Sequence, residues 1–170
     1  MMNDYQFRPI DRQTAAQIVR WRYEPPYDIY NDEDSEEAIE WYLNPDFHYY
    51  SVWQYGELVA FRNFGVDAQV LGGYYSADAL DMGGGLRPDL TGKGLGAGLM
   101  TAAFAFAREK FDPPAFRATV AGFNLRAQKV CLRVGYREVQ QFVNEKSGRE
   151  FVVFWKDVDG KFYFAPSQIV

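Results

Sequence analysis

Four glycines alternate with other residues between positions 92 and 98 and form the most distinctive pattern in the chain: Gly92, Gly94, Gly96 and Gly98. A segment typical of a strand precedes them, and an apolar run typical of a buried helix follows. Backbone N–H groups at the start of a helix have no partner inside it, and the helix dipole favours an anion there. Because glycine also lets phosphate oxygens approach the main chain, the pattern predicts a loop that binds a phosphate-containing ligand.

Two common phosphate loops fit this spacing poorly. A Walker loop would need glycine at position 87 and a hydroxyl residue at position 94, where the chain has Arg87 and Gly94, so ATPase chemistry is disfavoured. A dinucleotide loop is formally matched by Gly92-x-Gly94-x-x-Ala97. That motif expects an acid at the end of the next strand to hold the ribose, but the segment over 116–121 ends in Thr-Val-Ala. A nicotinamide oxidoreductase therefore stays a less favoured alternative.

A third type of loop matches better. The segment LRPDLTGKGLGAGL, residues 86–99, resembles the acetyl-coenzyme A motif of the GNAT superfamily of N-acetyltransferases, whose core is Gln/Arg-x-x-Gly-x-Gly/Ala. Thr91, Gly94 and Gly96 occupy its three defining places, with threonine where the family usually has glutamine or arginine. The segment over 124–136 resembles the family's next motif at the expected spacing. Two motifs in order, separated by a predicted strand, are more specific than either glycine loop alone.

The resemblance covers residues 79–155 well and the N-terminal half only by its order of elements. It implies that the strand before the loop splays from its neighbour and binds the pantetheine arm of the coenzyme through its main chain. It also implies that the loop holds the pyrophosphate, while Asn124 either bonds the arm or simply caps its own helix. The residues implied to bind acetyl-coenzyme A are Gly84, Leu86, Thr91, Gly92, Lys93, Gly94, Leu95, Gly96, Ala97 and Asn124.

Three groups are candidates for the acetyl transfer itself. The resemblance implies that the main-chain N–H of Leu86 polarises the thioester carbonyl. Asp81 interrupts an otherwise apolar strand, so it either faces solvent or projects into the cleft as the base for the amine. The family often places a tyrosine seven residues after the motif asparagine as the proton donor, and this chain has Cys131 there. A thiol could donate a proton, but a lone cysteine on an apolar helix face is more often a buried hydrophobe.

Charge is divided between the two halves of the chain. Residues 23–61 contain ten acidic residues and no lysine or arginine, whereas residues 86–137 contain nine basic residues against three acids. This division favours a cationic ligand near the first half and an anionic one on the second, although both runs could equally be solvated faces. The segment WRYEPPYDIYNDED alternates aromatic rings with carboxylates, which suits a protonated amine as well as a stacked aromatic core. The predicted acceptor-binding residues are Trp21, Tyr23, Tyr27 and Tyr30.

Periodicity and breakers predict an α/β (α+β) fold in one domain over residues 1–170. Strands are expected over 5–9, 48–54, 58–64, 78–86, 116–121, 136–143 and 150–155, and helices over 14–23, 35–43, 95–111 and 124–134. With the resemblance, this order implies a GNAT-like mixed, mostly antiparallel twisted sheet flanked by helices. The polar tail from residue 157 onward is left unassigned.

Composition excludes several classes of protein. The net charge of −5 argues against general nucleic-acid binding, which needs a basic footprint. One cysteine and one histidine are too few for a structural zinc site, so no metal is expected. No window approaches the ~18 apolar residues of a membrane span, and the N-terminus lacks an apolar leader, so we expect a cytoplasmic protein that does not bind membranes.

We therefore expect an N-acetyltransferase that moves an acetyl group from acetyl-coenzyme A to a primary amine by direct transfer in a ternary complex. The acceptor would be a cationic small molecule or a peptide N-terminus. The alternative is a non-catalytic sensing or interaction module that binds acyl-coenzyme A, because the usual tyrosine is missing and the base is weakly defined. The sequence leaves the oligomeric state open, a dimer included.

Overall fold

A seven-stranded sheet organises the chain, and its strands follow the order β1-β2-β3-β4-β5-β7-β6. The computed structural model describes residues 4–75 and 78–160. Neighbouring strands are antiparallel except for the parallel pair β4 and β5, so the expected mixed, mostly antiparallel sheet is confirmed. The strands are β1 (Tyr5–Pro9), β2 (Tyr49–Gln54), β3 (Glu57–Phe64), β4 (Leu80–Leu86), β5 (Ala115–Ala121), β6 (Arg137–Asn144) and β7 (Arg149–Asp157).

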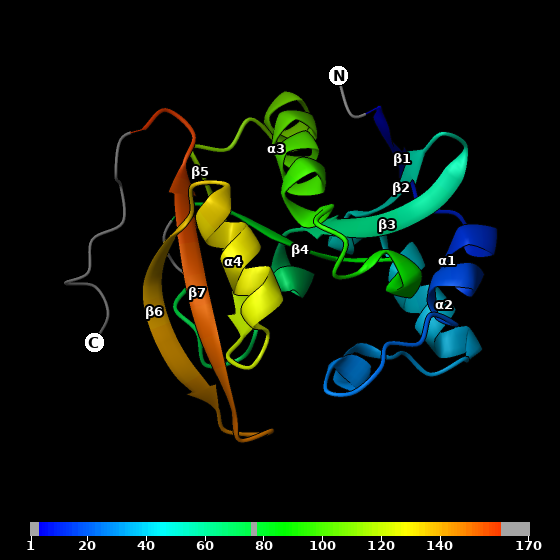
Figure 1. The fold of residues 1–170 in the computed structure, drawn as a ribbon, viewed down its shortest axis with the longest axis horizontal. Helices are drawn as coiled ribbons and strands as arrows, with labels where there is room; N and C mark the ends of the chain where they lie inside the picture. The colour runs from blue at the N-terminus through cyan, green and yellow to red at the C-terminus, as the bar shows by residue number, and fades with distance from the viewer. Residues whose placement is uncertain (1–3, 76–77, 161–170) are drawn as a thin grey trace.

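Helices pack on both faces of the sheet (Figure 1). Helices α1 (Arg12–Ile18) and α2 (Glu36–Leu43) share an apolar cluster with residues of β2 and β3. Helix α3 (Gly96–Phe111) packs on the opposite face, and α4 (Leu125–Arg133) lies beside α3 and against the second half of the sheet. Short 3-10 turns link these elements, namely η1 (Tyr27–Tyr30), η2 (Pro45–Phe47), η3 (Val66–Ala68) and η4 (Pro88–Leu90). In the part of the chain that the structure describes, no helix combines the length and apolar character needed to cross a membrane.

Local sequence signals explain where most elements begin. The side chain of Asp11 accepts a hydrogen bond from the Thr14 N–H at 2.7 Å and caps α1. Ser35 caps α2 in the same way, as its position before two glutamates indicated. Tyr55 and Gly56, with φ of 50° and 79°, form the tight turn between β2 and β3.

Helix α1 is shorter than the predicted helix over 14–23. After Ile18 the backbone changes to i→i+3 hydrogen bonds, with the Trp21 N–H donating to the Ile18 carbonyl at 2.9 Å. The tightened turn ends the helix before Pro25 is reached. Trp21 and Tyr23 consequently lie in the segment after α1 and not on its surface.

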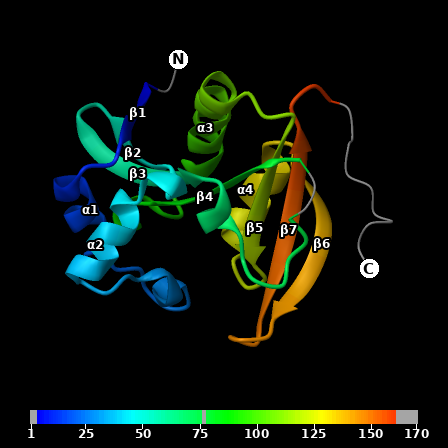
Figure 2. The same cartoon turned by 180° about the vertical axis from the view of Figure 1, so that it is seen from behind.

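Strands β4 and β5 pair over a very short length. Their register joins only Leu80 to Phe116 and Asp81 to Arg117. Beyond Asp81 the two strands diverge, and Figure 2 shows β4 running across the molecule while β5 and β7 turn away from it. The expected splay of the strand before the glycine loop is therefore present, and residues 82–86 of β4 have no pairing with β5. This break in strand pairing is called the gap between β4 and β5.

A buried ion pair holds the closed end of this gap. The Arg117 Nε and Nη2 atoms lie 2.6 and 2.7 Å from the two carboxylate oxygens of Asp81, and both residues are almost fully buried. Gln69 donates a further hydrogen bond to Asp81 at 2.9 Å. Asp81 thus has an ion-pair partner that the sequence did not reveal, because Arg117 lies 36 positions away. A carboxylate held this way does not suit the role of catalytic base.

Removing one member of this pair should destabilise the fold strongly. We expect Asp81→Ala to lower the free energy of unfolding by about 3 to 5 kcal/mol, because it leaves the Arg117 charge buried without its partner. Urea unfolding followed by circular dichroism measures the loss. The control is Glu40→Ala, which breaks an exposed pair with Arg12 and should leave the unfolding midpoint nearly unchanged. Equal effects of the two substitutions would contradict the structural role of Asp81.

Candidate functional site

The glycine loop lies at the open end of the gap between β4 and β5. It follows η4 and leads into α3, whose N-cap, Leu95, makes no side-chain capping bond. Within the described ranges, no protein acceptor bonds the N–H groups of residues 92–97. Gly94 has a φ of 78°, and a side chain placed there would meet no atom within 4 Å. The loop therefore presents unpaired N–H donors to open space, as an anion site requires.

The polar side chains of this loop have different roles. Thr91 donates a hydrogen bond to the Pro88 carbonyl at 2.8 Å, so it stabilises the turn before the loop. Lys93 is exposed and could reach a ligand on the loop. Arg87 instead pairs with Asp89 at 2.7 Å and bonds the Leu58 carbonyl at 2.8 Å, so it is held against β3.

Gly84 and Leu86 lie on the part of β4 that faces the gap. Gly84 has a φ of 141°, and a side chain there would come within 2.3 Å of the Phe61 carbonyl oxygen, so only glycine fits. The Arg87 N–H donates to the Val59 carbonyl of β3 at 2.8 Å. Because successive N–H groups along a strand point to opposite sides, the N–H of Leu86 points away from β3 and into the gap.

The start of α4 forms the far side of this gap. Asn124 accepts a hydrogen bond from the Ala127 N–H at 3.1 Å, so it caps its helix, and its Nδ2 donates to the Tyr30 hydroxyl at 3.2 Å. Tyr27 packs against Phe123 with 5.7 Å between ring centroids. The Arg126 guanidinium lies 3.9 Å above the Tyr27 ring, and its Nη1 would lie 3.3 Å from a side chain at Gly92. Sequence reasoning missed Arg126 as a cation beside the glycine loop, although it is the first basic residue of α4.

The four aromatic residues expected to bind the acceptor do not lie together. Tyr27 and Tyr30 contact Phe123 next to α4. Trp21 packs on Phe61 with 6.1 Å between centroids, within the α1 and α2 cluster. The Tyr23 hydroxyl donates to the Leu86 carbonyl at 2.7 Å. The segment thus divides, with one pair beside the glycine loop and the other beside β3 and β4.

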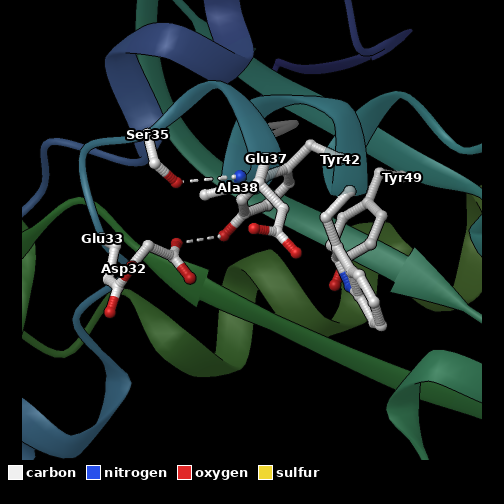
Figure 3. A pocket seen from close by; sticks show the side chains of 8 residues that line it. Asp32, Glu33, Ser35, Glu37, Ala38, Tyr42 and Tyr49 are labelled. Atoms are coloured by element: carbon white, nitrogen blue, oxygen red, sulfur yellow. Dashed lines mark hydrogen bonds between the residues drawn. The ribbon is translucent and has the colours of Figure 1, made fainter.

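An acidic pocket of about 380 Å³ lies under α2 on the face of the sheet that carries Phe61. Figure 3 shows the Asp32 carboxylate bonded to the Tyr42 hydroxyl, with the Glu37 carboxylate turned toward the same space. Its lining combines carboxylates with aromatic side chains, namely Asp32, Glu33, Ser35, Glu37, Ala38, Trp41, Tyr42 and Tyr49. The acidic run in the sequence pointed to this region, but none of these residues was singled out, because only the packing of α2 brings them together.

Burial changes the acid–base properties of this pocket. It raises the pKa of Asp32 above its ordinary value, although the hydrogen bond from Tyr42 opposes the change. It also raises the pKa of Tyr42 and Tyr49. Both phenols therefore stay protonated and act as donors, Tyr42 to Asp32 and Tyr49 to Asp67. The pocket is consequently anionic through its carboxylates alone.

Tyr23 connects this pocket with the edge of β4. The Tyr23 hydroxyl interacts electrostatically with Asp32, and burial raises the pKa of this hydroxyl. A side chain at Gly85 would lie 2.9 Å from that hydroxyl and 3.1 Å from the Phe61 ring, which itself contacts Tyr42 edge-on at 5.5 Å. The acidic pocket and the end of β4 are thus linked through two aromatic side chains, Tyr23 and Phe61.

Cys131 is buried on α4 against Met82 and Tyr136, with 2% of its surface exposed. Burial raises the pKa of its thiol to about 12. The thiol is therefore neither a thiolate nor close to solvent at neutral pH. Of the described residues, no three histidine, cysteine, aspartate or glutamate side chains form a group that could hold a metal ion.

Comparison with solved structures identifies proteins of the same fold. AAC(6')-Ib in complex with ribostamycin and coenzyme A has a TM-score of 0.73 at 15% identity, covering 91% of this chain and 94% of that one. A chimera of the spermidine N-acetyltransferase SpeG from Vibrio cholerae and hSSAT has a TM-score of 0.71 at 16% identity, over 90% and 95% of the two chains. YncA of Salmonella typhimurium, a putative acetyltransferase with acetyl-coenzyme A, has a TM-score of 0.65 at 19% identity, over 96% and 98%.

No curated protein matches the chain in sequence. The model of the acetyltransferase (GNAT) family matches residues 15–136, which run from within α1 to the residue before β6 and include the glycine loop and α4. The family match and the fold agree with the resemblance carried by the two motifs. The chain belongs to the GNAT family of acetyltransferases.

Proposed function

We propose that the protein transfers an acetyl group from acetyl-coenzyme A to a primary amine of a small molecule that carries more than one amino group. The observation that carries this proposal is the hydrogen bond from Tyr23 to the Leu86 carbonyl. Tyr23 also interacts electrostatically with Asp32 of the acidic pocket, so the bond supports an acceptor site on the side of β4 where the thioester would lie. Direct transfer in a ternary complex needs this adjacency of donor and acceptor sites.

The coenzyme would occupy the gap between β4 and β5. Its pyrophosphate would accept hydrogen bonds from the free N–H groups of residues 92–97, with Lys93 and Arg126 supplying positive charge. The pantetheine arm would run along Gly84 and Leu86, beside Asn124. The N–H of Leu86 would then stabilise the negative charge that develops on the carbonyl oxygen during transfer.

The acidic pocket supports a polycationic acceptor. Asp32, Glu33 and Glu37 place three carboxylates around one space, and Trp41 adds an aromatic face. Such a lining attracts ammonium groups through ion pairing and cation–π contact. Relatives in fold whose names specify spermidine or whose structures contain ribostamycin point to the same chemical class. A polyamine or an aminosugar is therefore a better candidate than a peptide N-terminus with a single amine.

Asp32 would accept the proton of the amine through an intervening water, because aromatic side chains lie between its pocket and the end of β4. Burial raises its pKa, which brings a carboxylate closer to the range useful for general base catalysis. Tyr42 orients the carboxylate through its hydrogen bond of 2.7 Å. This assignment takes the role from Asp81, whose carboxylate is held by Arg117.

One observation favours the non-catalytic alternative, a module that binds acyl-coenzyme A without transfer. The position of the family's usual proton donor is occupied by Cys131, whose thiol is buried with a pKa raised to about 12. Coenzyme A release across a panel of polyamines and aminosugars separates the two. A binding module would bind acetyl-coenzyme A and release no thiol with any of them.

Gly94→Glu should abolish coenzyme binding, because it places a negative side chain where the pyrophosphate would lie. The matched control is Gly56→Glu in the turn between β2 and β3, where φ is 79° and space is equally open. Both carry the same backbone strain of about 1 to 2 kcal/mol. Acetyl-coenzyme A at ~100 times its dissociation constant adds about 2.7 kcal/mol, so it should raise the melting temperature of the native protein and the control by several degrees. A rise in Gly94→Glu, or a rise with NAD in place of acetyl-coenzyme A, would contradict the site.

Asp32→Asn should lower kcat/KM for the amine by about a hundredfold or more, while leaving the affinity for acetyl-coenzyme A unchanged. In the native protein the rate should increase as pH rises through the raised pKa of Asp32, because the ionised form accepts the proton, and this limb should disappear in the variant. Asp34→Asn is the control, since Asp34 pairs with Arg20 outside the pocket. If both substitutions had the same effect, Asp32 would not be the base.

Cys131 should take no part in the reaction. Because the thiol is buried and its pKa is raised to about 12, little of it is ionised at pH 8, so iodoacetamide should modify it very slowly until the protein is unfolded. Cys131→Ala should keep turnover within a few-fold. Rapid modification of the native protein, together with a hundredfold loss of turnover in the variant, would restore it as acid or nucleophile.

A further inference from the structure

Arg62 is a buried cation without an acidic partner. It lies on β3 between Ala60 and Phe64, on the face of the sheet covered by α3. Only 8% of its surface is exposed, and its Nε atom has no hydrogen-bond partner. Within residues 4–75 and 78–160, no carboxylate forms an ion pair with it, in contrast to Arg117. A buried charge of this kind is unfavourable unless another group compensates it.

The neighbours of Arg62 are neutral. The groups that interact with its charge are Cys131, Tyr136 and Tyr23, and burial lowers its own pKa. A guanidinium nevertheless keeps its proton in proteins. Since burial also raises the pKa of Cys131 and Tyr136, neither supplies a counter-charge. Asp81 also acts on Tyr136, but its carboxylate is held by Arg117, so Arg62 has no anionic partner among the described residues.

The side chain of Arg62 is directed across β4. Arg62 pairs in register with Gly84, and a side chain on Gly84 would lie 2.8 Å from the Arg62 Cδ atom. The missing side chain thus lets the arginine pass over β4 toward Cys131 on α4. Its guanidinium consequently lies close to the strand along which the proposed function runs the coenzyme arm.

We propose that Arg62 is a catalytic residue that binds the sulfur of the coenzyme and stabilises the thiolate that leaves during acetyl transfer. The inference rests on the proposed function, because the thioester must lie in the gap between β4 and β5. It explains how transfer proceeds without a protonated tyrosine at position 131. It also explains why an unpaired arginine is retained in the interior.

The step balances without any further reactant. The amine nitrogen attacks the thioester carbonyl carbon, a C–N bond forms, and the carbonyl electrons move to the oxygen near the Leu86 N–H. When the intermediate collapses, the C–S bond breaks and its electron pair goes to sulfur. The proton of the amine goes through water to Asp32, and the thiolate pairs with the Arg62 guanidinium, which keeps its own proton. The thiolate then leaves and takes a proton from water, while Asp32 releases its proton to water and returns to the carboxylate.

The test measures the thiol of bound coenzyme A by its thiolate absorbance as pH is raised. An opposite charge in contact with an acid shifts its ionisation constant by about tenfold or more. We therefore expect the thiol to ionise at least about tenfold more readily when bound to the native protein than when free. Arg62→Met should remove this shift, and Arg62→Lys should retain part of it. The titratable neighbours Cys131, Tyr136 and Tyr23 are the same in all three proteins.

Two controls make each outcome decisive. Arg133→Met removes an exposed arginine from the same helix as Cys131 and should leave the shift intact. Desulfo-coenzyme A, which lacks the sulfur, should bind the native protein and Arg62→Met equally well, which shows that the variant is folded and its loop intact. Normal binding of both ligands with an unshifted thiol would overturn the role of Arg62 alone. Failure of the native protein to bind either ligand would overturn the proposed function instead.

A carboxylate on the acyl group is the other anion that a buried arginine could bind. If the native protein preferred succinyl-coenzyme A to acetyl-coenzyme A by tenfold or more, and Arg62→Met lost that preference, Arg62 would select the acyl group. That result would overturn its role toward the thiolate.

Discussion

The buried pair between Asp81 and Arg117 is the interaction on which the site depends. It lies at the last of the two register positions that join β4 to β5, and a sheet that continued further would leave no gap for a ligand. A buried ion pair contributes little net stability, but breaking it is costly because one charge is left alone. It holds the two strands together at the point where pairing stops, and beyond it the main chain of residues 82–86 keeps one edge free.

Every other part of the site is placed relative to that free edge. Gly84 lets Arg62 cross β4 toward the gap on one face of the sheet, while Tyr23 bonds the Leu86 carbonyl on the other. The glycine loop follows directly, because β4 ends at Leu86 and η4 turns the chain into α3. One strand thus has a free backbone edge and separates a buried cation from an acidic pocket, and in the proposed function this edge binds the coenzyme.

The sequence predicted the parts that depend on local signals. The bounds of β1 agree, and Ser35 and Asn124 cap the expected helices. The glycine pattern and the motif over 124–136 were sufficient for the family. The features that the sequence did not reveal depend on distant contacts. The partner of Asp81 is 36 positions away, and the acidic pocket forms only when α2 packs on β2 and β3. Arg62 was missed for the same reason, because an arginine in a strand shows nothing of its burial until the fold is known.

Amide hydrogen exchange with and without acetyl-coenzyme A tests whether the coenzyme lies in the gap between β4 and β5. The N–H groups of residues 92–97 have no protein acceptor among the described residues, and that of Leu86 points into the gap. The account predicts that acetyl-coenzyme A slows exchange at these amides, while the turn at Tyr55 and Gly56 stays unchanged. Binding that protected other segments and left Leu86 and the loop as they were would contradict the account.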